Sequence, residues 1–169
     1  AQCNNLPYTL LLASRLKKAG YRILLDFHYS DGWADPGKQE IPQAWSHIGF
    51  KELERVLYEY TKSVMEAFIR DGGAPDMVQI GNEIPPGMLW DHGRVAEAHE
   101  SNSLHWHLKE SSNDPEAWFR FGKLVKAGIA AVNDATGKKT EIMIHVDRGG
   151  DIPANRWFFD NLMAQGVEF

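Results

Sequence analysis

Two hydrophobic patterns alternate along this chain, and each is typical of one kind of secondary structure. Short, nearly continuous apolar runs at 21–27, 77–80 and 142–146 predict buried strands of a parallel sheet, because such strands are covered on both faces. A further run at 166–169 predicts the beginning of a fourth strand. The long intervals between these runs leave room for a helix after each strand.

Within those intervals, apolar residues recur every three or four positions, which predicts amphipathic helices. The longest stripe predicts a helix from Phe50 to about residue 70, with apolar positions at Phe50, Leu53, Leu57, Tyr60, Val64 and Phe68. Asp114 followed by Pro115 predicts a helix start, because Asp caps a first turn and Pro fits the first helical position. Shorter stripes predict helices over 7–19 and 153–163, and the polar stretch 94–113 predicts a long loop.

The alternation of helices and strands predicts an α/β fold built from repeated βαβ units. An open doubly wound sheet and an eight-stranded barrel both have this order. No glycine-rich phosphate loop follows a strand, and polar and aromatic residues stand there instead, which favours the barrel. Because a full barrel needs about 250 residues, we expect a partial (β/α)8 TIM barrel. Residues 1–169 would be one segment of it, roughly strands three to six with their helices, truncated at both ends.

Composition narrows the classes of partner. The 18 basic and 23 acidic residues give a net charge of −5, and no cluster of basic residues indicates a nucleic-acid-binding face. The single cysteine, Cys3, excludes an internal disulfide and a cysteine-based zinc site. No apolar run approaches the roughly 18 residues that a membrane span needs. We therefore expect a globular domain that binds neither nucleic acid nor a membrane.

Polar residues that could take part in catalysis or substrate binding follow three of the predicted strands. Asp26 and His28 are two positions apart on a strand and share one face, and Trp33 and Asp35 follow them. The indole of Trp33 offers a flat face to a sugar ring. An Asp-His pair that only fixes the end of the strand is the structural alternative, and a Trp that only packs its loop is another.

The second group is Asn82 and Glu83, which come directly after the strand at 77–80. A carboxyl at the mouth of a barrel suits proton donation to a leaving oxygen, and partial burial would raise its pKa toward the working range. Asn82 could bind a substrate hydroxyl, and Trp90 could line the same cleft. A turn with a solvated acid is the structural alternative for this dipeptide.

The third group is His145 and Asp147, which again share one face of a strand. Three strand ends with inward polar residues favour a functional site over three unrelated structural pairs. His99, His105 and His107 stand in the predicted loop, where a solvated surface is favoured over a metal role.

The run from Leu25 to Gln39 resembles the glycoside hydrolase family 53 endo-β-1,4-galactanases, and so do 80–84, 87–90, 145–147 and 157–160. The resemblance implies a (β/α)8 barrel that cleaves β-1,4-galactan of pectic side chains with retention. It implies that Glu83 is the general acid/base. It also implies a sugar cleft lined or supported by Asp26, His28, Trp33, Asp35, Asn82, Trp90, His145 and Asp147.

This sequence departs from the family pattern at several positions. Gly32 stands where Thr is frequent, Asp91 where proline follows the Leu-Trp pair, and the insert at 99–113 is longer. The family's nucleophile, a Glu after the seventh strand, has no matching motif here, so we expect the chain alone to be inactive. The resemblance implies no cofactor or metal, a polysaccharide partner, a monomeric parent protein, and an extracellular or periplasmic location.

Two other functions remain open from the residues. Asp26, His28, Glu83, His145 and Asp147 are plausible ligands for Zn²⁺ or Mn²⁺ in a metal-dependent barrel hydrolase or isomerase. Their spacing lacks the short motifs that mark such centres. A segment with one catalytic carboxylate could also act only as a non-catalytic carbohydrate-binding segment.

Overall fold

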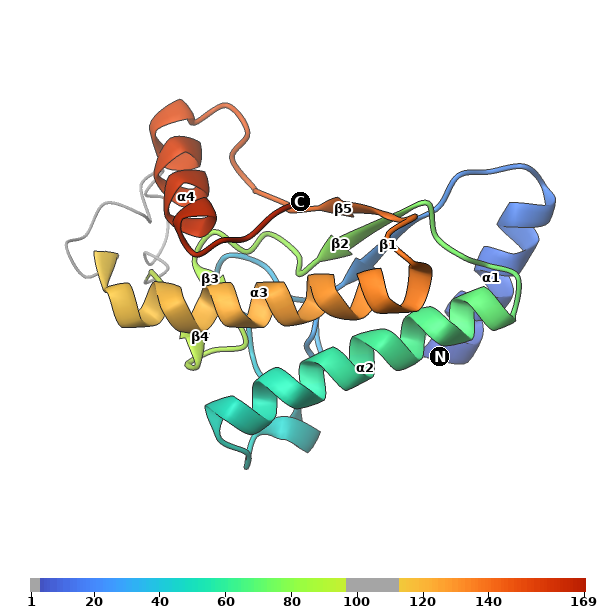
Figure 1. The fold of residues 1–169 in the computed structure, drawn as a ribbon, viewed down its shortest axis with the longest axis horizontal. Helices are drawn as coiled ribbons and strands as arrows, with labels where there is room; N and C mark the ends of the chain where they lie inside the picture. Colours follow the sequence, from blue (N-terminus) through green and yellow to red (C-terminus); the bar gives the residue numbers. More distant parts are fainter. Residues whose placement is uncertain (1–3, 97–112) are drawn as a thin grey trace.

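Three parallel strands form the sheet of this protein. The computed structural model describes residues 4–96 and 113–169. In that part, β1 (Leu24–Phe27), β2 (Met77–Ile80) and β5 (Glu141–Met143) pair in the order β1-β2-β5. The ladder places Asp26 beside Gln79, and Gln79 beside Met143. The carboxyl ends of the three strands therefore meet at one edge of the sheet, as Figure 1 shows.

The described chain has four α-helices: α1 (Leu6–Lys18), α2 (Phe50–Arg70), α3 (Pro115–Thr136) and α4 (Ile152–Ala164). In Figure 1, α2 and α3 run side by side along one face of the sheet, with α1 and α4 at its two ends. The predicted start of α3 is confirmed, because the Asp114 side chain accepts a hydrogen bond from the Glu116 amide and Pro115 follows the cap. None of the helices in the described ranges is long and apolar enough to cross a membrane.

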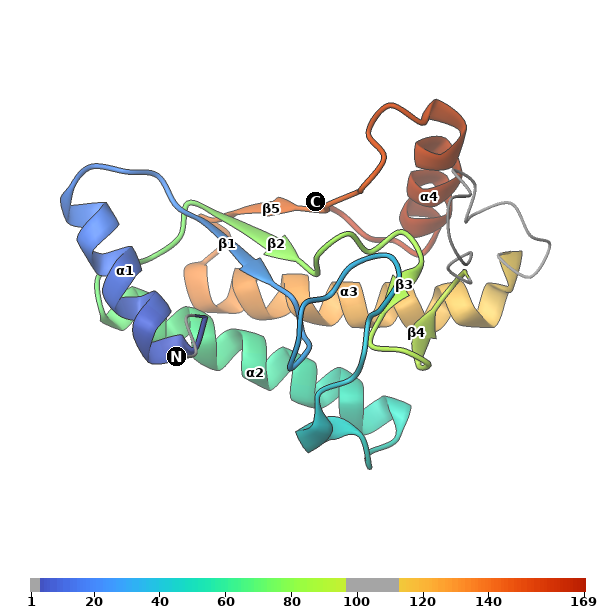
Figure 2. The ribbon, with the colours of Figure 1, turned by 180° about the vertical axis from the view of Figure 1, so that it is seen from behind.

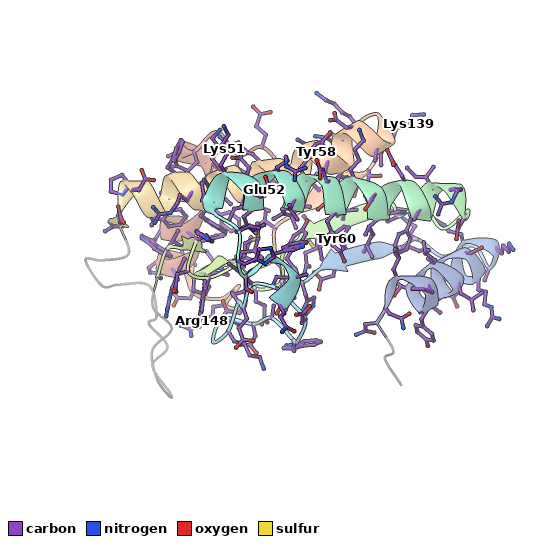
Figure 3. All side chains as sticks on the ribbon, turned by 90° about the horizontal axis from the view of Figure 1, so that it is seen from below. Lys51, Glu52, Tyr58, Tyr60, Lys139 and Arg148 are labelled. Carbon is purple, nitrogen blue, oxygen red and sulfur yellow. The ribbon has the colours of Figure 1, made fainter. Side chains whose placement is uncertain are left out.

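The core fills the space between the sheet and the two long helices. Phe27 packs against Tyr60, which extends from α2 toward β1 (Figure 3). Gly128 of α3 lets that helix approach β2, because a Cβ there would lie 2.9 Å from a methyl carbon of Ile80. Alternation along β1 then turns Asp26 to the opposite face, away from the helices. The helices thus cover one face, and the other carries the polar strand residues.

The observed strands are shorter than the apolar runs. β1 begins at Leu24 because its partner β2 begins at Met77, and β5 ends at Met143 because β2 bends away at Gly81, where φ is 78°. The strand expected at 166–169 is not formed in the described chain. A strand requires a ladder partner, and β5 pairs with β2 alone. Instead, Val167 is buried in the core and the Phe169 ring packs against Phe159.

Three small elements were absent from the sequence expectations: the 3₁₀ turn η1 (Gln43–Trp45), β3 (Gly87–Met88) and β4 (Gly93–Arg94). β3 and β4 pair as a short antiparallel hairpin, which Figure 2 shows beside the loop that follows β1. Gly87 is required there, because its φ is 95° and a Cβ would lie 2.0 Å from the Gly93 carbonyl oxygen. The hairpin ends at Arg94, the first residue of the predicted loop 94–113, and most of that loop lies outside the described residues.

Candidate active site

The first group of predicted residues forms a connected unit at the end of β1. The His28 Nε2 lies 2.9 Å from a carboxylate oxygen of Asp26, as their shared face predicts. The Nδ1 of His28 accepts a hydrogen bond from the Ala34 amide at 3.2 Å. Because Nδ1 accepts, the ring proton is on Nε2 and is donated to Asp26. The imidazole thereby ties the loop after β1 back to the strand.

Asn82 connects the loops that follow all three strands. Its Nδ2 donates to the Ala34 carbonyl at 2.9 Å, and its Oδ1 accepts from Gln79 Nε2 at 3.3 Å. The same Oδ1 lies 2.9 Å from the Nδ1 of His145, which follows β5. The side chain is buried, so these bonds replace the water that it loses. Because Oδ1 can only accept, the Nδ1 of His145 carries a proton and donates it.

Glu83 follows Asn82 and is the partly buried carboxyl of this site. Its φ of 48° lies in the left-handed region, which costs free energy for a residue other than glycine. Burial raises the pKa of the Glu83 carboxyl, and the charges of Asp147 and Asp35 raise it further, whereas His145 and His28 act in the opposite direction. A carboxyl with a raised pKa keeps its proton at a pH where an ordinary glutamate has lost it.

The two remaining acids of the site are Asp35 and Asp147, and the charge of each raises the pKa of the Glu83 carboxyl. Asp35 Oδ1 accepts from the Gly37 amide at 2.8 Å, and its backbone pairs with Lys38. Asp147 lies 3.1 Å from the guanidinium Nε of Arg148, and its Oδ1 is buried without a hydrogen-bond partner among the described residues. Both carboxylates are held by short local contacts.

The two predicted tryptophans take different places. Trp33 is 63% exposed, and its ring meets the His28 ring edge to face at 4.8 Å between centroids. Trp90 lies between β3 and β4, its amide donates to the Gln39 carbonyl oxygen at 2.8 Å, and its ring stacks on the Arg94 guanidinium at 4.2 Å. It lines a separate groove of about 750 Å³ with Glu40, Ile41, Ser46, Phe50, Asp91, His92 and Arg120. The ring of Trp33 thus contacts the polar cluster directly, whereas the backbone of Trp90 is connected to it through Gln39.

Gln39 is a residue of this region that the sequence interpretation did not select. Its side chain is 1% exposed, and its Nε2 donates to the carbonyl oxygens of Asp35, Asn82 and Glu83 at 3.1, 2.9 and 3.4 Å. A buried glutamine has no local sequence signature. The one available signal was that Gln39 ends the run from Leu25 that resembles the family.

The described residues lack the geometry of a metal centre. In residues 4–96 and 113–169, no three His, Cys, Asp or Glu side chains are arranged to hold a metal ion. His99, His105, His107 and Cys3 lie outside those ranges. The cluster instead combines one partly buried acid with polar groups that hold its neighbours, which is an arrangement suited to general acid/base chemistry.

Comparison with known sequences identifies the family to which this chain belongs. The profile of Glycosyl hydrolase family 53 matches residues 1–169. A protein of Niallia circulans, described as an uncharacterized protein in the bgaB 5′ region, is 47% identical over 98% of this chain and 42% of its own length. The arabinogalactan endo-beta-1,4-galactanase of Thermothelomyces thermophilus is 36% identical over 96% of this chain and 43% of its own length.

Solved structures that resemble this chain come from the same family. The Ignisphaera aggregans GH53 catalytic domain superposes with a TM-score of 0.83 at 35% identity, over 98% of this chain and 40% of that chain. A structure from a study of two fungal beta-1,4-galactanases gives 0.79 at 34% identity, over 96% and 43%. The expected α/β fold, part of a (β/α)8 barrel, is confirmed. The chain spans about two fifths of the length of the relatives it matches.

Proposed function

Because the chain belongs to glycosyl hydrolase family 53, we propose that it forms part of the catalytic domain of an endo-acting glycosidase. The proposed reaction is cleavage of β-1,4-galactosidic bonds in galactan and type I arabinogalactan. The observation that carries the proposal is the partly buried Glu83 at the end of β2, whose carboxyl pKa is raised mainly by burial. The names of the relatives support the choice of substrate.

Glu83 acts in this mechanism as the general acid and then as the general base. Its carboxyl donates a proton to the glycosidic oxygen as the bond to the anomeric carbon breaks, and its carboxylate later takes a proton from the attacking water. Retention requires a second carboxylate about 5 to 5.5 Å away as nucleophile. We assign that nucleophile to a part of the domain outside this chain, in keeping with the share of the relatives that the chain spans.

The polar residues around Glu83 divide into two proposed roles. Trp33 has an exposed ring and contacts the sugar, together with the exposed edges of Asp26, His28 and Asp35. The buried residues support the cleft. Asn82 has its carboxamide committed to protein partners, one of which is His145. His145 and Asp147 follow β5, are partly buried, and act on the pKa of Glu83. Trp90 extends the binding surface along its own groove.

The direct test measures release of reducing ends from β-1,4-galactan. It compares residues 1–169 alone with the complete domain, by which we mean this chain joined to the remaining strands of the proposed barrel. We expect galactan cleavage by the complete domain only, unchanged after dialysis against a chelator. Loss of activity on chelation would support the metal-dependent alternative, and a complete domain that leaves galactan intact contradicts the proposed substrate. A polymeric substrate also favours action outside the cytoplasm, and we propose that the complete protein acts as a monomer.

Trp33→Ala is expected to weaken substrate binding with little effect on the chemical step. An exposed aromatic platform contributes about 0.5–1.5 kcal/mol, so KM for galactan should rise roughly two- to tenfold while kcat stays within about twofold. The melting temperature should hold, because the side chain is 63% exposed. Trp33→Phe is the matched control and should retain most of the affinity. Equal KM values for wild type and Trp33→Ala would remove Trp33 from the cleft.

A further inference from the structure

The carboxamide of Gln39 joins the loop after β1 to the loop after β2. Its Nε2 lies within hydrogen-bond distance of one carbonyl oxygen of its own loop, that of Asp35, and of two carbonyl oxygens across the gap, those of Asn82 and Glu83. The backbone carbonyl of Gln39 accepts from the Trp90 amide at 2.8 Å. One buried residue thus contacts three separate parts of the site.

The surrounding atoms determine the orientation of this carboxamide. Three carbonyl oxygens face it, and a carbonyl oxygen accepts but cannot donate, so the NH₂ group must point toward them. Its two hydrogens are shared among the three acceptors. The Oε1 of Gln39 points the other way and is buried without a hydrogen-bond partner among the described residues. The protein therefore tolerates an unsatisfied oxygen in order to keep the NH₂ group at this point.

We propose that Gln39 is a positioning residue, which fixes the left-handed backbone at Glu83 and so aims the carboxyl of that residue into the cleft. The backbone of Glu83, at φ 48°, needs support from outside its own loop to keep this conformation. Gln39 supplies that support at the carbonyls of residues 82 and 83. The proposal rests on the acid/base role of Glu83 for its kinetic consequence, and on geometry alone for the position of that side chain.

Loss of this support is expected to change the titration of Glu83 in a defined direction. The charged and titratable groups that face the Glu83 carboxyl are those of His145, Asp147, Asp35 and His28, and burial is the largest influence. A relaxed loop admits water and lowers the pKa of Glu83 toward its ordinary value. Because a general acid must be protonated, the alkaline limb of the activity profile then moves to lower pH.

The test uses Gln39→Met, which keeps an unbranched chain of similar length and removes both donors. In the complete domain, we expect kcat for galactan to fall about tenfold or more while KM changes less than about threefold, because displacement of a catalytic group acts on the chemical step. The alkaline limb should move to lower pH. Thr61→Val is the matched control. Thr61 of α2 is equally buried, and its hydroxyl bonds to Leu57 and Tyr29 at 2.8 and 2.9 Å and not to the loops that Gln39 joins.

The kinetic comparison separates positioning from general stability. A Gln39→Met protein whose kcat and pH profile match those of Thr61→Val, at a similar melting temperature, overturns the proposal. If Gln39→Met does not fold, Gln39→Glu carries the test. Its carboxyl donates one hydrogen bond only when protonated, so its kcat relative to wild type should recover as the pH falls. No recovery with falling pH also overturns the proposal.

A second readout is independent of the substrate. The ¹³Cδ resonance of Glu83, followed through a pH titration by NMR without galactan, should show a lower midpoint in Gln39→Met than in wild type and Thr61→Val. If the wild type does not cleave galactan, the proposed function fails while this titration still decides the positioning role. Identical midpoints in the three proteins contradict it.

Discussion

Glu83→Gln is expected to lower kcat/KM for β-1,4-galactan by about 10²- to 10⁴-fold in the complete domain, because glutamine has the same shape but no acidic proton. Initial rates of reducing-end release measure the loss. The alkaline limb that the raised pKa of Glu83 produces in the wild type should disappear from the residual activity. The melting temperature should remain close to that of the wild type, since the side chain is only partly buried and the substitution preserves its volume.

Two comparisons make this result specific. Glu66→Gln changes an exposed glutamate of α2 in the same way and should leave activity within about twofold. A galactoside with an acidic leaving group, such as a nitrophenyl glycoside, needs little protonation, so Glu83→Gln should slow its bond cleavage far less than that of galactan. A variant that loses both substrates equally, or neither, does not support an acid role for Glu83.

The sequence predicted the parts of this site that depend on one segment. Residues two apart on a strand share a face, so the contact of Asp26 with His28 could be predicted and is confirmed at 2.9 Å. The start of α3 could be predicted equally well, because an N-cap residue and a proline are local sequence signals. The placement of Glu83 at the end of β2 followed from the apolar run that precedes it.

The parts that depend on two loops meeting could not be predicted. Gln39 lies 43 positions before Asn82, and Ala34 lies 48 before it, so no local pattern indicates that their polar groups meet. The same limit applies to the hairpin of β3 and β4, whose strands are too short to show a period of two. At 166–169 the opposite error occurred, because a strand was predicted there and none is formed in the described chain. This run has the composition of a strand, but in the described chain Val167 is buried in the core and Phe169 stays half exposed, and neither has a ladder partner.

Asn82→Leu is expected to cause the largest loss of stability among changes in this cluster. Leucine has the same branched arrangement of heavy atoms as asparagine but leaves three groups without their partner: the Ala34 carbonyl, the Gln79 carboxamide and the Nδ1 of His145. Each unpaired buried group costs about 1–3 kcal/mol, so the free energy of unfolding should fall by about 3–5 kcal/mol. Thermal denaturation should show a melting temperature lower by roughly 6–20 °C.

The control for this change is Asn82→Asp, which keeps an acceptor for Gln79 and His145 and loses only the donor to Ala34. Its loss of stability should be about a third to a half of that of the leucine variant. The new charge beside Glu83 should raise the pKa of that carboxyl further, so the alkaline limb of activity should move to higher pH. Since Asn82→Leu introduces no charge, the two variants separate the stability of the three-loop junction from its electrostatic effect on the acid. Equal melting temperatures for wild type and Asn82→Leu would show that the loops are held together elsewhere.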